Sequence, residues 1–436
     1  MPSLYDYQVP LFWSTVQHLY YKGWAYLAAK ERVGKSAPAL FAANYYYPNG
    51  SVLIITLKKA IKGWKEIMNI FEGYFSIKVE LINYESIHKV KNTNPDIVIV
   101  DEAHKNISAY PDTGKTYTKV RAITYDKPLI LLSATPHPKS FSQIFHPLQL
   151  TKYSPFKEFR DFYDFFAYYG IPDKKYIKAG YTIPSYDKTR PELEQWITPQ
   201  LIVLDRKDLG FVEPVVNPIY IENLKITKEL SKNMMDYREL VIDNIIVEAI
   251  SPADEKQKIQ QIEGGTLKFT KKYKIPTING KFISISTKKQ ADELGLIWED
   301  VKPETYKFFF KCAKLNYLLQ NYPDSPDMVI MHNFILEKEL LSRYYKKAKI
   351  LQITANAFGV DLSQYKKLVI YSFNWRRDVF IQSMVRQANK DRKEAIQVDY
   401  LLAKNGVSEA MYKTLTEAKK SFTDSVYENA KKFFDF

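Results

Sequence analysis

Two acidic residues directly follow an apolar run in the segment IVIVDEAH, residues 97–104. A run this apolar is typical of a central strand, and a carboxylate at the end of such a strand is suited to hold a cation. A second carboxylate beside the first is suited to take a proton from a reacting water. Asp101 is therefore a candidate magnesium ligand and Glu102 a candidate general base. The alternative is that both are ordinary solvated acids at a strand end.

The segment AAKERVGKSAPAL supplies residues that suit a phosphate. Gly34-Lys35-Ser36 matches the end of the pattern G-x-x-x-x-G-K-[ST], although Ala29 stands where its first glycine is usual. Glycine lets backbone amides approach a phosphate, and a helix N-terminus adds its positive dipole end. Lys35 would reach the β- and γ-phosphates and Ser36 would give an oxygen to Mg²⁺. Three such residues alone also occur in a solvated turn, but Asp101 and Glu102 downstream favour a nucleotide site.

The elements that position these residues alternate along the first 150 positions. Short apolar runs are separated by helix-length stretches: WAYLAAK, SVLIITL, IKVELINY, DIVIVDEA and PLILLSATP. This pattern predicts parallel strands joined by helices. It returns after Asp327 with DMVIMHNF, AKILQIT, KKLVIYSFNW and IQVDYLL. The sequence therefore predicts an α/β fold with two parallel sheets and a different region between them.

That middle region includes a predicted hairpin. Asn279-Gly280 separates two strand-like runs, and this pair favours a two-residue hairpin turn. The segment is dense in lysine and also carries Phe269 and Tyr273. It would suit a basic, aromatic wedge that stacks on unpaired bases. The alternative is an insertion that packs between the two sheets and only touches nucleic acid.

Composition restricts the partners and the compartment. The 436 residues carry a formal charge of +14, from 63 Lys and Arg against 49 Asp and Glu. Such a surplus suggests a polyanionic partner, although a generally basic surface is the alternative. The single cysteine, Cys312, excludes an intramolecular disulfide and a cysteine-rich metal site. No apolar run reaches the ~18–20 residues of a membrane span, so we expect a cytoplasmic protein without membrane contact.

The order of the motifs resembles a known family. GKS, then DEAH, then LLSATP is similar to motifs I, II and III of superfamily 2 helicases and translocases. YDYQ resembles the glutamine motif, while LINYESI, DEAHKNIS and SATPHPKSFSQIFHPLQL resemble the Swi/Snf-type branch. VIMHNF is similar to motif IV, and the stretch ITANAFGVDLSQYKKLVIYSFNWRRDVFIQSMVRQANKDR to motifs V and VI. A chain of this length looks most like phage-encoded helicases that act on branched DNA.

The resemblance implies two RecA-like lobes that close on ATP and Mg²⁺. We expect the first lobe at residues 1–152, a helical and hairpin region at 153–300, and the second lobe at 301–436. Residues implied to bind the nucleotide or its metal are Gln8, Gly34, Lys35, Ser36, Asp101, Gly359 and Asp361. Those implied to act in catalysis are Lys35, Glu102, Gln382 and Arg386, the last as an arginine finger. The family usually places a second arginine at the position of Asn389, with Lys390 and Arg392 as nearby replacements.

A path for nucleic acid is implied across both lobes. Its expected residues are Thr56, Lys58, Lys59, Trp64, Tyr84, His332, Asn333, Thr354, Lys271 and Lys272. Core packing is the alternative for Trp64 and Tyr84, and a solvated loop is the alternative for Lys58 and Lys59.

The expected function is that of an ATP-dependent DNA helicase or translocase. Forked or branched DNA and proteins of replication or recombination would be its partners, in replication, recombination or repair. We expect a monomer in the host cytoplasm. One alternative is a duplex translocase that remodels protein–DNA complexes without separating strands. Another is a weakly hydrolysing, ATP-gated DNA clamp, suggested by Ala29 and Asn389; an RNA helicase fits the motifs less well.

Overall fold

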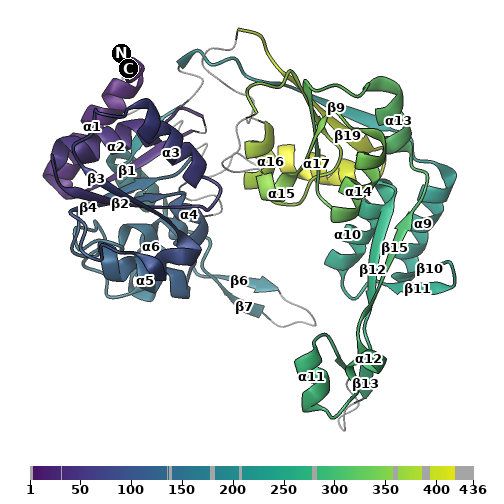
Figure 1. The fold of residues 1–436 in the computed structure, drawn as a ribbon. Helices are drawn as coiled ribbons and strands as arrows, with labels where there is room; N and C mark the ends of the chain where they lie inside the picture. Colours follow the sequence, from purple (N-terminus) through teal and green to yellow (C-terminus); the bar gives the residue numbers. More distant parts are fainter. Residues whose placement is uncertain are drawn as a thin grey trace.

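Two parallel sheets form the centres of two lobes in the computed structural model (Figure 1). The structure describes residues 3–30, 32–134, 136, 140–176, 182–205, 209–276, 282–356, 362–384 and 393–417. The two lobes confirm the predicted α/β fold. In Figure 1, the part of the first lobe that carries α3 and α4 faces α15 and α16 of the second.

The first sheet has six parallel strands in the order β3-β2-β4-β5-β1-β8. Their bounds are β1 (Trp24–Ala29), β2 (Ser51–Thr56), β3 (Lys78–Asn83), β4 (Ile97–Asp101), β5 (Leu129–Leu132) and β8 (Ile202–Leu204). The strands β1, β4 and β5 are buried along their whole length. A strand buried on both faces is apolar throughout, which explains the continuous runs in the sequence.

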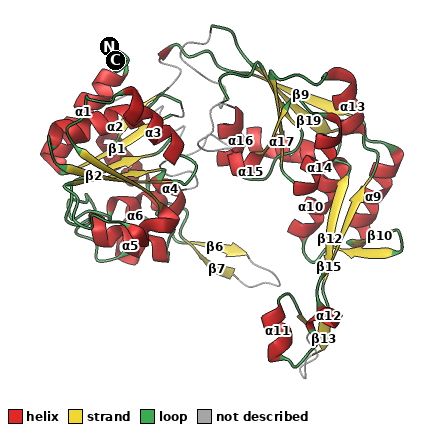
Figure 2. Ribbon diagram, in the orientation of Figure 1, coloured by secondary structure: helices red, strands yellow, loops and turns green. Residues whose placement is uncertain are grey.

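Helices cover both faces of this sheet (Figure 2). They are α1 (Gln8–Lys22), α2 (Ser36–Tyr46), α3 (Ile61–Ile70), α4 (Ala103–Asn106), α5 (Lys115–Thr124), α6 (Phe145–Leu148), α7 (Phe162–Tyr169) and α8 (Pro191–Ile197), with 3₁₀ turns η1 (Tyr84–Lys89), η2 (Phe141–Ile144) and η4 (Thr198–Gln200). Alternate strand residues enter opposite cores, because side chains of a strand alternate between faces. Ala25 and Leu27 pack with α1, α2 and α3, whereas Tyr26 packs with the aromatic side chains of α6 and α7.

The second sheet has five parallel strands in the order β17-β16-β18-β19-β9. Their bounds are β9 (Val215–Ile221), β16 (Met328–His332), β17 (Lys349–Gln352), β18 (Lys367–Ile370) and β19 (Gln397–Ala403). The helices of this lobe are α13 (Ala313–Asn321), α14 (Ile335–Tyr344), α15 (Ile353–Asn356), α16 (Arg377–Met384) and α17 (Val407–Glu417).

An insertion extends from the second lobe between β9 and α13 (Figure 1). It contains α9 (Lys225–Tyr237), β10 (Glu239–Ile242), β11 (Ile245–Glu248), α10 (Pro252–Glu263), β12 (Thr266–Lys271), β13 (Lys274–Pro276), β14 (Phe282–Ser284), α11 (Lys288–Glu293), α12 (Trp298–Val301) and β15 (Glu304–Phe309). The strands β12 and β15 form an antiparallel ribbon. At its far end β13 pairs with β14 in an antiparallel hairpin, with Pro276 opposite Phe282. The predicted two-residue turn at Asn279-Gly280 lies outside the described residues and stays a prediction.

The strand pairing differs from the boundaries expected at 152 and 300. Ile202 of β8 pairs with Leu27 of β1, so the first lobe continues to residue 204. Val215 of β9 pairs with Gln397 of β19, so the second lobe begins before the insertion and not after it. The aromatic segment after residue 153 belongs to the first lobe, where a hairpin of β6 (Asp173–Tyr176) and β7 (Thr182–Ser185) extends from it. Every helix in the described part of the chain is too short or too polar to span a bilayer.

Candidate active site

The carboxyl ends of the first sheet bring the sequence motifs together. The loop of Gly34 follows β1, Thr56 ends β2, Tyr84 follows β3, Asp101 ends β4 and Ser133 follows β5. Because all these strands are parallel, their carboxyl ends meet at one edge, where ligands bind in open α/β sheets. In the register of the sheet, Leu132 of β5 is opposite both Asp101 and Leu27. The metal candidate and the phosphate loop therefore flank one strand.

The phosphate loop has the predicted strand–loop–helix form. β1 ends at Ala29 and α2 begins at Ser36. Gly34 has φ +70°, and a Cβ at this position would lie 2.5 Å from Nε2 of Gln8. Both the left-handed backbone and this close approach require glycine. Lys35 and Ser36 are half-buried at the start of α2, where backbone amides and the helix dipole favour a phosphate.

Gln8 braces the phosphate loop. Its Nε2 donates to the carbonyl oxygens of Gly34 at 3.0 Å and of Val33 at 3.4 Å. Its Oε1 accepts from the backbone N–H of Tyr5 at 3.1 Å. The side chain is buried, so these bonds hold α1 against the loop. The implied binding of Gln8 to the nucleotide stays a prediction.

Asp101 is held by two neutral donors on the same oxygen. Its Oδ2 accepts from Thr56 Oγ1 at 2.8 Å and from Trp64 Nε1 at 3.0 Å. Burial raises the pKa of the Asp101 carboxyl, the Glu102 carboxylate raises it further, and the Lys35 ammonium lowers it. A cation would stabilise the ionised form of such a buried acid. Since Oδ2 is occupied, Oδ1 is the oxygen through which this side chain would serve a metal.

The surroundings fit a magnesium ion better than a metal with several protein ligands. Among the described residues, no three His, Cys, Asp or Glu side chains gather as a metal site. Mg²⁺ usually keeps several waters and takes one or two carboxylates together with phosphate oxygens. Asp101 and the hydroxyl of Ser36 match this small ligand set. Water and phosphate oxygens would supply the remaining ligands of such an ion.

Glu102 occupies a strained turn. Its backbone has φ 53° and ψ 41°, a left-handed conformation that a residue with a side chain adopts at a cost. The side-chain Oε2 is buried without a hydrogen-bond partner in the described part of the chain, and lies 3.4 Å from Nδ1 of His104. A buried acceptor left unbonded is expensive, and such groups mark functional positions. Glu102 is therefore equipped to accept a hydrogen bond from a water.

His104 connects the motif after β4 with the motif after β5. Its Nδ1 forms a hydrogen bond of 2.8 Å with Ser133 Oγ, and both side chains are buried. Movement of the segment after β5 would therefore reach the turn that carries Glu102. The sequence alone assigns no role to His104 or Ser133. The fixed order DEAH and SAT was the signal available, but the bond itself depends on β4 and β5 being neighbours.

Three residues expected on the nucleic-acid path are core residues instead. Thr56, Trp64 and Tyr84 are 0%, 2% and 3% exposed. Thr56 and Trp64 donate to the Asp101 side chain, and the Tyr84 hydroxyl donates to the Asp101 carbonyl oxygen at 2.6 Å. Their side chains are too deeply buried to contact nucleic acid, and they position Asp101. By contrast, Lys58 and Lys59 are exposed in the turn between Thr56 and α3.

The expected residues of the second lobe also separate into two groups. His332 is 1% exposed, and its Nδ1–H donates to the Phe334 carbonyl oxygen at 2.9 Å. Burial lowers the pKa of His332 to about 4, so the ring is neutral and directed into the lobe, which corrects its expected role. Thr354 is exposed on α15 and Asn333 is half-buried after β16. Both lie just after the carboxyl ends of β16 and β17, and their contact with nucleic acid stays a prediction.

The remaining candidates lie on α16, at the end of β12 or outside the described residues. Gln382 is buried on α16. Lys271 and Lys272 are exposed at the end of β12, far along the ribbon. Gly359, Asp361, Arg386 and Asn389 lie outside the described residues, so the arginine finger stays a prediction.

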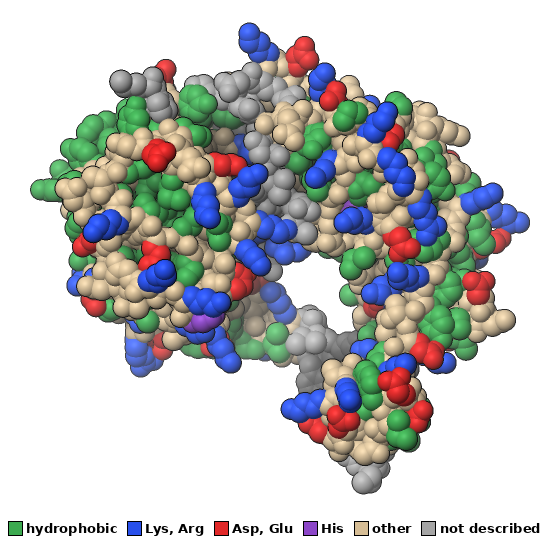
Figure 3. All heavy atoms as spheres, viewed as in Figure 1, with side chains coloured by type: hydrophobic (Ala, Val, Ile, Leu, Met, Phe, Trp, Pro, Cys, Tyr) green, Lys and Arg blue, Asp and Glu red, His purple; other side chains and the backbone are tan. Residues whose placement is uncertain are grey.

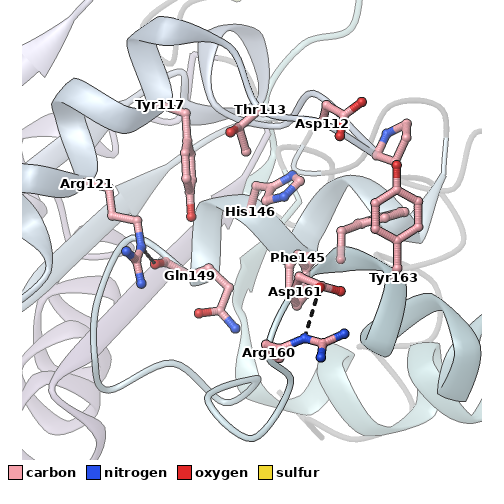
Figure 4. A pocket seen from close by; sticks show the side chains of 12 residues that line it. Asp112, Thr113, Tyr117, Arg121, Phe145, His146, Gln149, Arg160, Asp161 and Tyr163 are labelled. Atoms are coloured by element: carbon pink, nitrogen blue, oxygen red, sulfur yellow. Dashed lines mark hydrogen bonds and ion pairs between the residues drawn. The ribbon is translucent and has the colours of Figure 1, made fainter.

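A separate cavity of about 360 Å³ lies elsewhere in the first lobe, between the loop of residues 111–113, α5, α6 and the start of α7 (Figure 4). His146 lines it, with Nδ1–H donating to the Ala109 carbonyl oxygen at 2.6 Å. Burial lowers the pKa of His146 to about 4, so its ring is neutral. The walls contain none of the residues predicted to bind nucleotide or nucleic acid.

The solved structures similar to this chain include two SWI2/SNF2 ATPase cores. The SWI2/SNF2 ATPase core of Sulfolobus solfataricus in complex with dsDNA is 14% identical, with 98% of this chain and 94% of that chain covered and a TM-score of 0.39. The SWI2/SNF2 ATPase core domain of the same organism is 11% identical, with 100% and 95% covered and a TM-score of 0.40. No family model and no curated protein matches the chain.

Proposed function

We propose that this chain is an ATP-dependent DNA motor, a helicase or translocase, that couples ATP hydrolysis to movement on DNA. The observation that carries this proposal is the convergence of Lys35, Ser36, Asp101 and Glu102 at one edge of a parallel sheet. Phosphate cradle, metal carboxylate and general base are the parts that phosphoryl transfer to water requires. Bound Mg²⁺ would neutralise phosphate charge; the chain's own residues position the reactants.

Glu102 is the residue proposed to orient and deprotonate the attacking water. Its unpartnered Oε2 supports this role, because a water would satisfy the buried acceptor. The hydrogen bond between His104 and Ser133 would keep that oxygen in place while the second lobe closes. Gly359, Asp361, Gln382 and Arg386 are proposed to approach the same nucleotide from the second lobe, with Arg386 stabilising charge on the transferred phosphoryl group.

DNA is proposed as the polymer on which the motor acts. The charge of +14 supports a polyanionic partner. Figure 3 shows Lys and Arg side chains on both sides of the hollow between the lobes. Lys58 and Lys59 of the first lobe and Asn333 and Thr354 of the second are the candidates for backbone contacts. Such contacts hold the strand without reading its sequence.

Strand separation at a fork is a finer proposal that concerns the insertion. Lys271 and Lys272 are exposed near the far end of the ribbon, and Tyr273 beside them is 51% exposed. A basic and aromatic tip suits unpaired bases. Deletion of residues 271–287 is expected to abolish unwinding of a labelled forked oligonucleotide while DNA-stimulated ATPase survives. Unchanged unwinding would dismiss the wedge, and a wild type that never unwinds but moves on duplex DNA would establish the translocase alternative.

Phosphate release with and without duplex DNA tests the motor itself. The wild type should release phosphate faster when DNA is added, and Glu102→Gln should lower the rate by about 100-fold because it removes the proposed base. The matched control is Glu85→Gln, which changes an exposed carboxylate in η1 and should leave the rate within about twofold. A wild type that binds ATP and DNA without turnover would favour the ATP-gated clamp.

A further inference from the structure

A short segment of the first lobe is attached at both ends to one carboxylate oxygen. We name residues 56–64 the strap. Thr56 at its start and Trp64 at its end both donate to Oδ2 of Asp101, at 2.8 and 3.0 Å. Trp64 is the buried residue of α3, while the rest of that helix is half-buried or exposed. The indole N–H is therefore directed into the lobe, at the carboxylate.

The strap is compact enough to move as a unit. The N–H of Ala60 donates to the Leu57 carbonyl oxygen at 2.8 Å, and the N–H of Trp64 donates to the Ala60 carbonyl oxygen at 3.1 Å. A turn and the first helical turn thus link Thr56 directly to Trp64. A displacement of the turn at residues 57–60 would therefore move both Thr56 and Trp64, because these backbone hydrogen bonds connect the turn to each of them.

Residues 57–59 of the strap are placed to contact both DNA and the second lobe. Lys58 and Lys59 are exposed and are the proposed DNA contacts of this lobe. Leu57 packs against the core of the first lobe and also against the core of the second, which contains Val329, Met331 and Leu368. One turn therefore presents two cations to DNA and one apolar side chain to the opposite lobe.

We propose that the strap couples DNA binding and lobe closure to the metal carboxylate, with Thr56 and Trp64 as positioning residues. Binding of DNA to Lys58 and Lys59, together with closure of the second lobe onto Leu57, would fix the positions of the Thr56 and Trp64 donors on Oδ2. The orientation of the Asp101 carboxylate, and therefore the direction of Oδ1, would follow. The inference rests on the proposed function and adds its regulation. Hydrogen bonds to a charged group are strong enough to fix such an orientation.

The indole N–H resonance of Trp64 provides a test that does not depend on turnover. The chain has six tryptophans, and Trp64→Phe assigns this resonance by removing it. Duplex DNA added without nucleotide should shift the Trp64 resonance and leave that of Trp24, which is buried in β1 away from Asp101, unchanged. Lys58→Ala with Lys59→Ala should abolish the shift and keep the resonance. A Trp64 resonance that DNA, shown to be bound, does not move would overturn the proposal.

The demand for Mg²⁺ provides a second test. In the wild type, DNA should lower the Mg²⁺ concentration that gives half-maximal ATPase. Trp64→Phe and the isosteric Thr56→Val each remove one donor, and should raise that concentration about tenfold and remove its response to DNA. Thr56→Ser keeps the hydroxyl and should restore the wild-type response, and Trp24→Phe controls for the loss of a buried indole.

The possible outcomes distinguish failure of the strap proposal from failure of the proposed motor function. If the variants only lower kcat in proportion to their thermal stability, with the same Mg²⁺ response to DNA as the wild type, the donors are merely structural and the strap proposal fails. If the wild type shows no DNA-stimulated ATPase, the proposed function itself fails. Should Trp64→Phe not fold, the pair Thr56→Val and Thr56→Ser decides alone, since both differ from threonine by little volume.

Discussion

Asp101 of the first lobe and Glu337 of the second are both buried near the carboxyl ends of their sheets, and they differ in the groups that surround them. Asp101 of the first lobe uses one oxygen for Thr56 and Trp64 and has Lys35 nearby in the phosphate loop. Glu337 of the second lobe accepts on Oε2 from the N–H groups of Asn333 and Phe334 and from Ser372 Oγ.

The cations beside the two acids explain the difference. Lys314, the cation near Glu337, is 0% exposed and also interacts with the buried Glu263. Lys35 is half-buried in a loop that a phosphate can reach. Burial raises the pKa of both acids, so a perturbed pKa does not by itself identify a catalytic site. The accessibility of the neighbouring lysine therefore distinguishes the proposed metal carboxylate, Asp101, from Glu337.

The largest expected effect comes from exchanging each acid for its amide. Asp101→Asn should lower the ATPase kcat by about 100-fold or more, because it removes the charge that faces the metal. Glu337→Gln should leave kcat within about threefold, since it touches no reactant. Phosphate release with saturating DNA measures both. A similar decrease of kcat in both variants would contradict the assignment of a catalytic role to Asp101 alone.

For the two lysines, the larger loss of stability is expected in the second lobe and the larger loss of ATPase in the first. Lys314→Met leaves Glu263 and Glu337 without their buried cation, and should lower the free energy of unfolding by about 3 kcal/mol or more. Lys35→Met should change it by less than about 1 kcal/mol, because the loop faces solvent, while it abolishes ATPase. Urea unfolding followed by circular dichroism gives both values. A Lys314→Met protein as stable as the wild type would contradict the role of Lys314 in stabilising Glu263 and Glu337.

A smaller effect concerns pH. Burial raises the pKa of Glu337 from 4.5 to about 7, so the folded state binds this proton more tightly than the unfolded state does. The stability from this group is therefore complete below about pH 4.5 and is lost as the pH rises through 7. The free energy of unfolding of the wild type relative to Glu337→Gln should fall between pH 5 and pH 8. A constant difference across these pH values would show that Glu337 is ionised throughout.

The histidines should have the opposite dependence. Burial lowers the pKa of His146 and of His332 from 6.5 to about 4, so their contribution is present above pH 6.5 and is lost as the pH falls through 4. His332→Gln should therefore reduce the loss of stability between pH 6.5 and pH 4, measured by the same unfolding experiment. A wild type and variant with parallel profiles in that range would contradict a neutral, buried ring.

Local patterns predicted much of this protein because they depend on chemistry within a few residues. The apolar runs that end at Ala29 and Asp101 had to be central strands, and glycine at position 34 indicated a close backbone approach. The hairpin strands around 274–284 followed from their turn signal. The boundary at 152 was wrong for a long-range reason: a strand as short as Ile202–Leu204 has too few residues for a pattern, and its place is set by pairing with β1.

The sequence by itself determined the fold class, the order of the motifs and the residue types that can hold phosphate, metal and water, because each depends on a short stretch of chain. Only the tertiary structure decided that Trp64 and Thr56 serve Asp101 and not DNA, and that His104 reaches Ser133. Strands β2, β4 and β5 become neighbours through pairing across the sheet, so those hydrogen bonds join residues 29 to 45 positions apart. The direction of a side chain at such a junction depends on the packing of the whole lobe, which no local pattern contains.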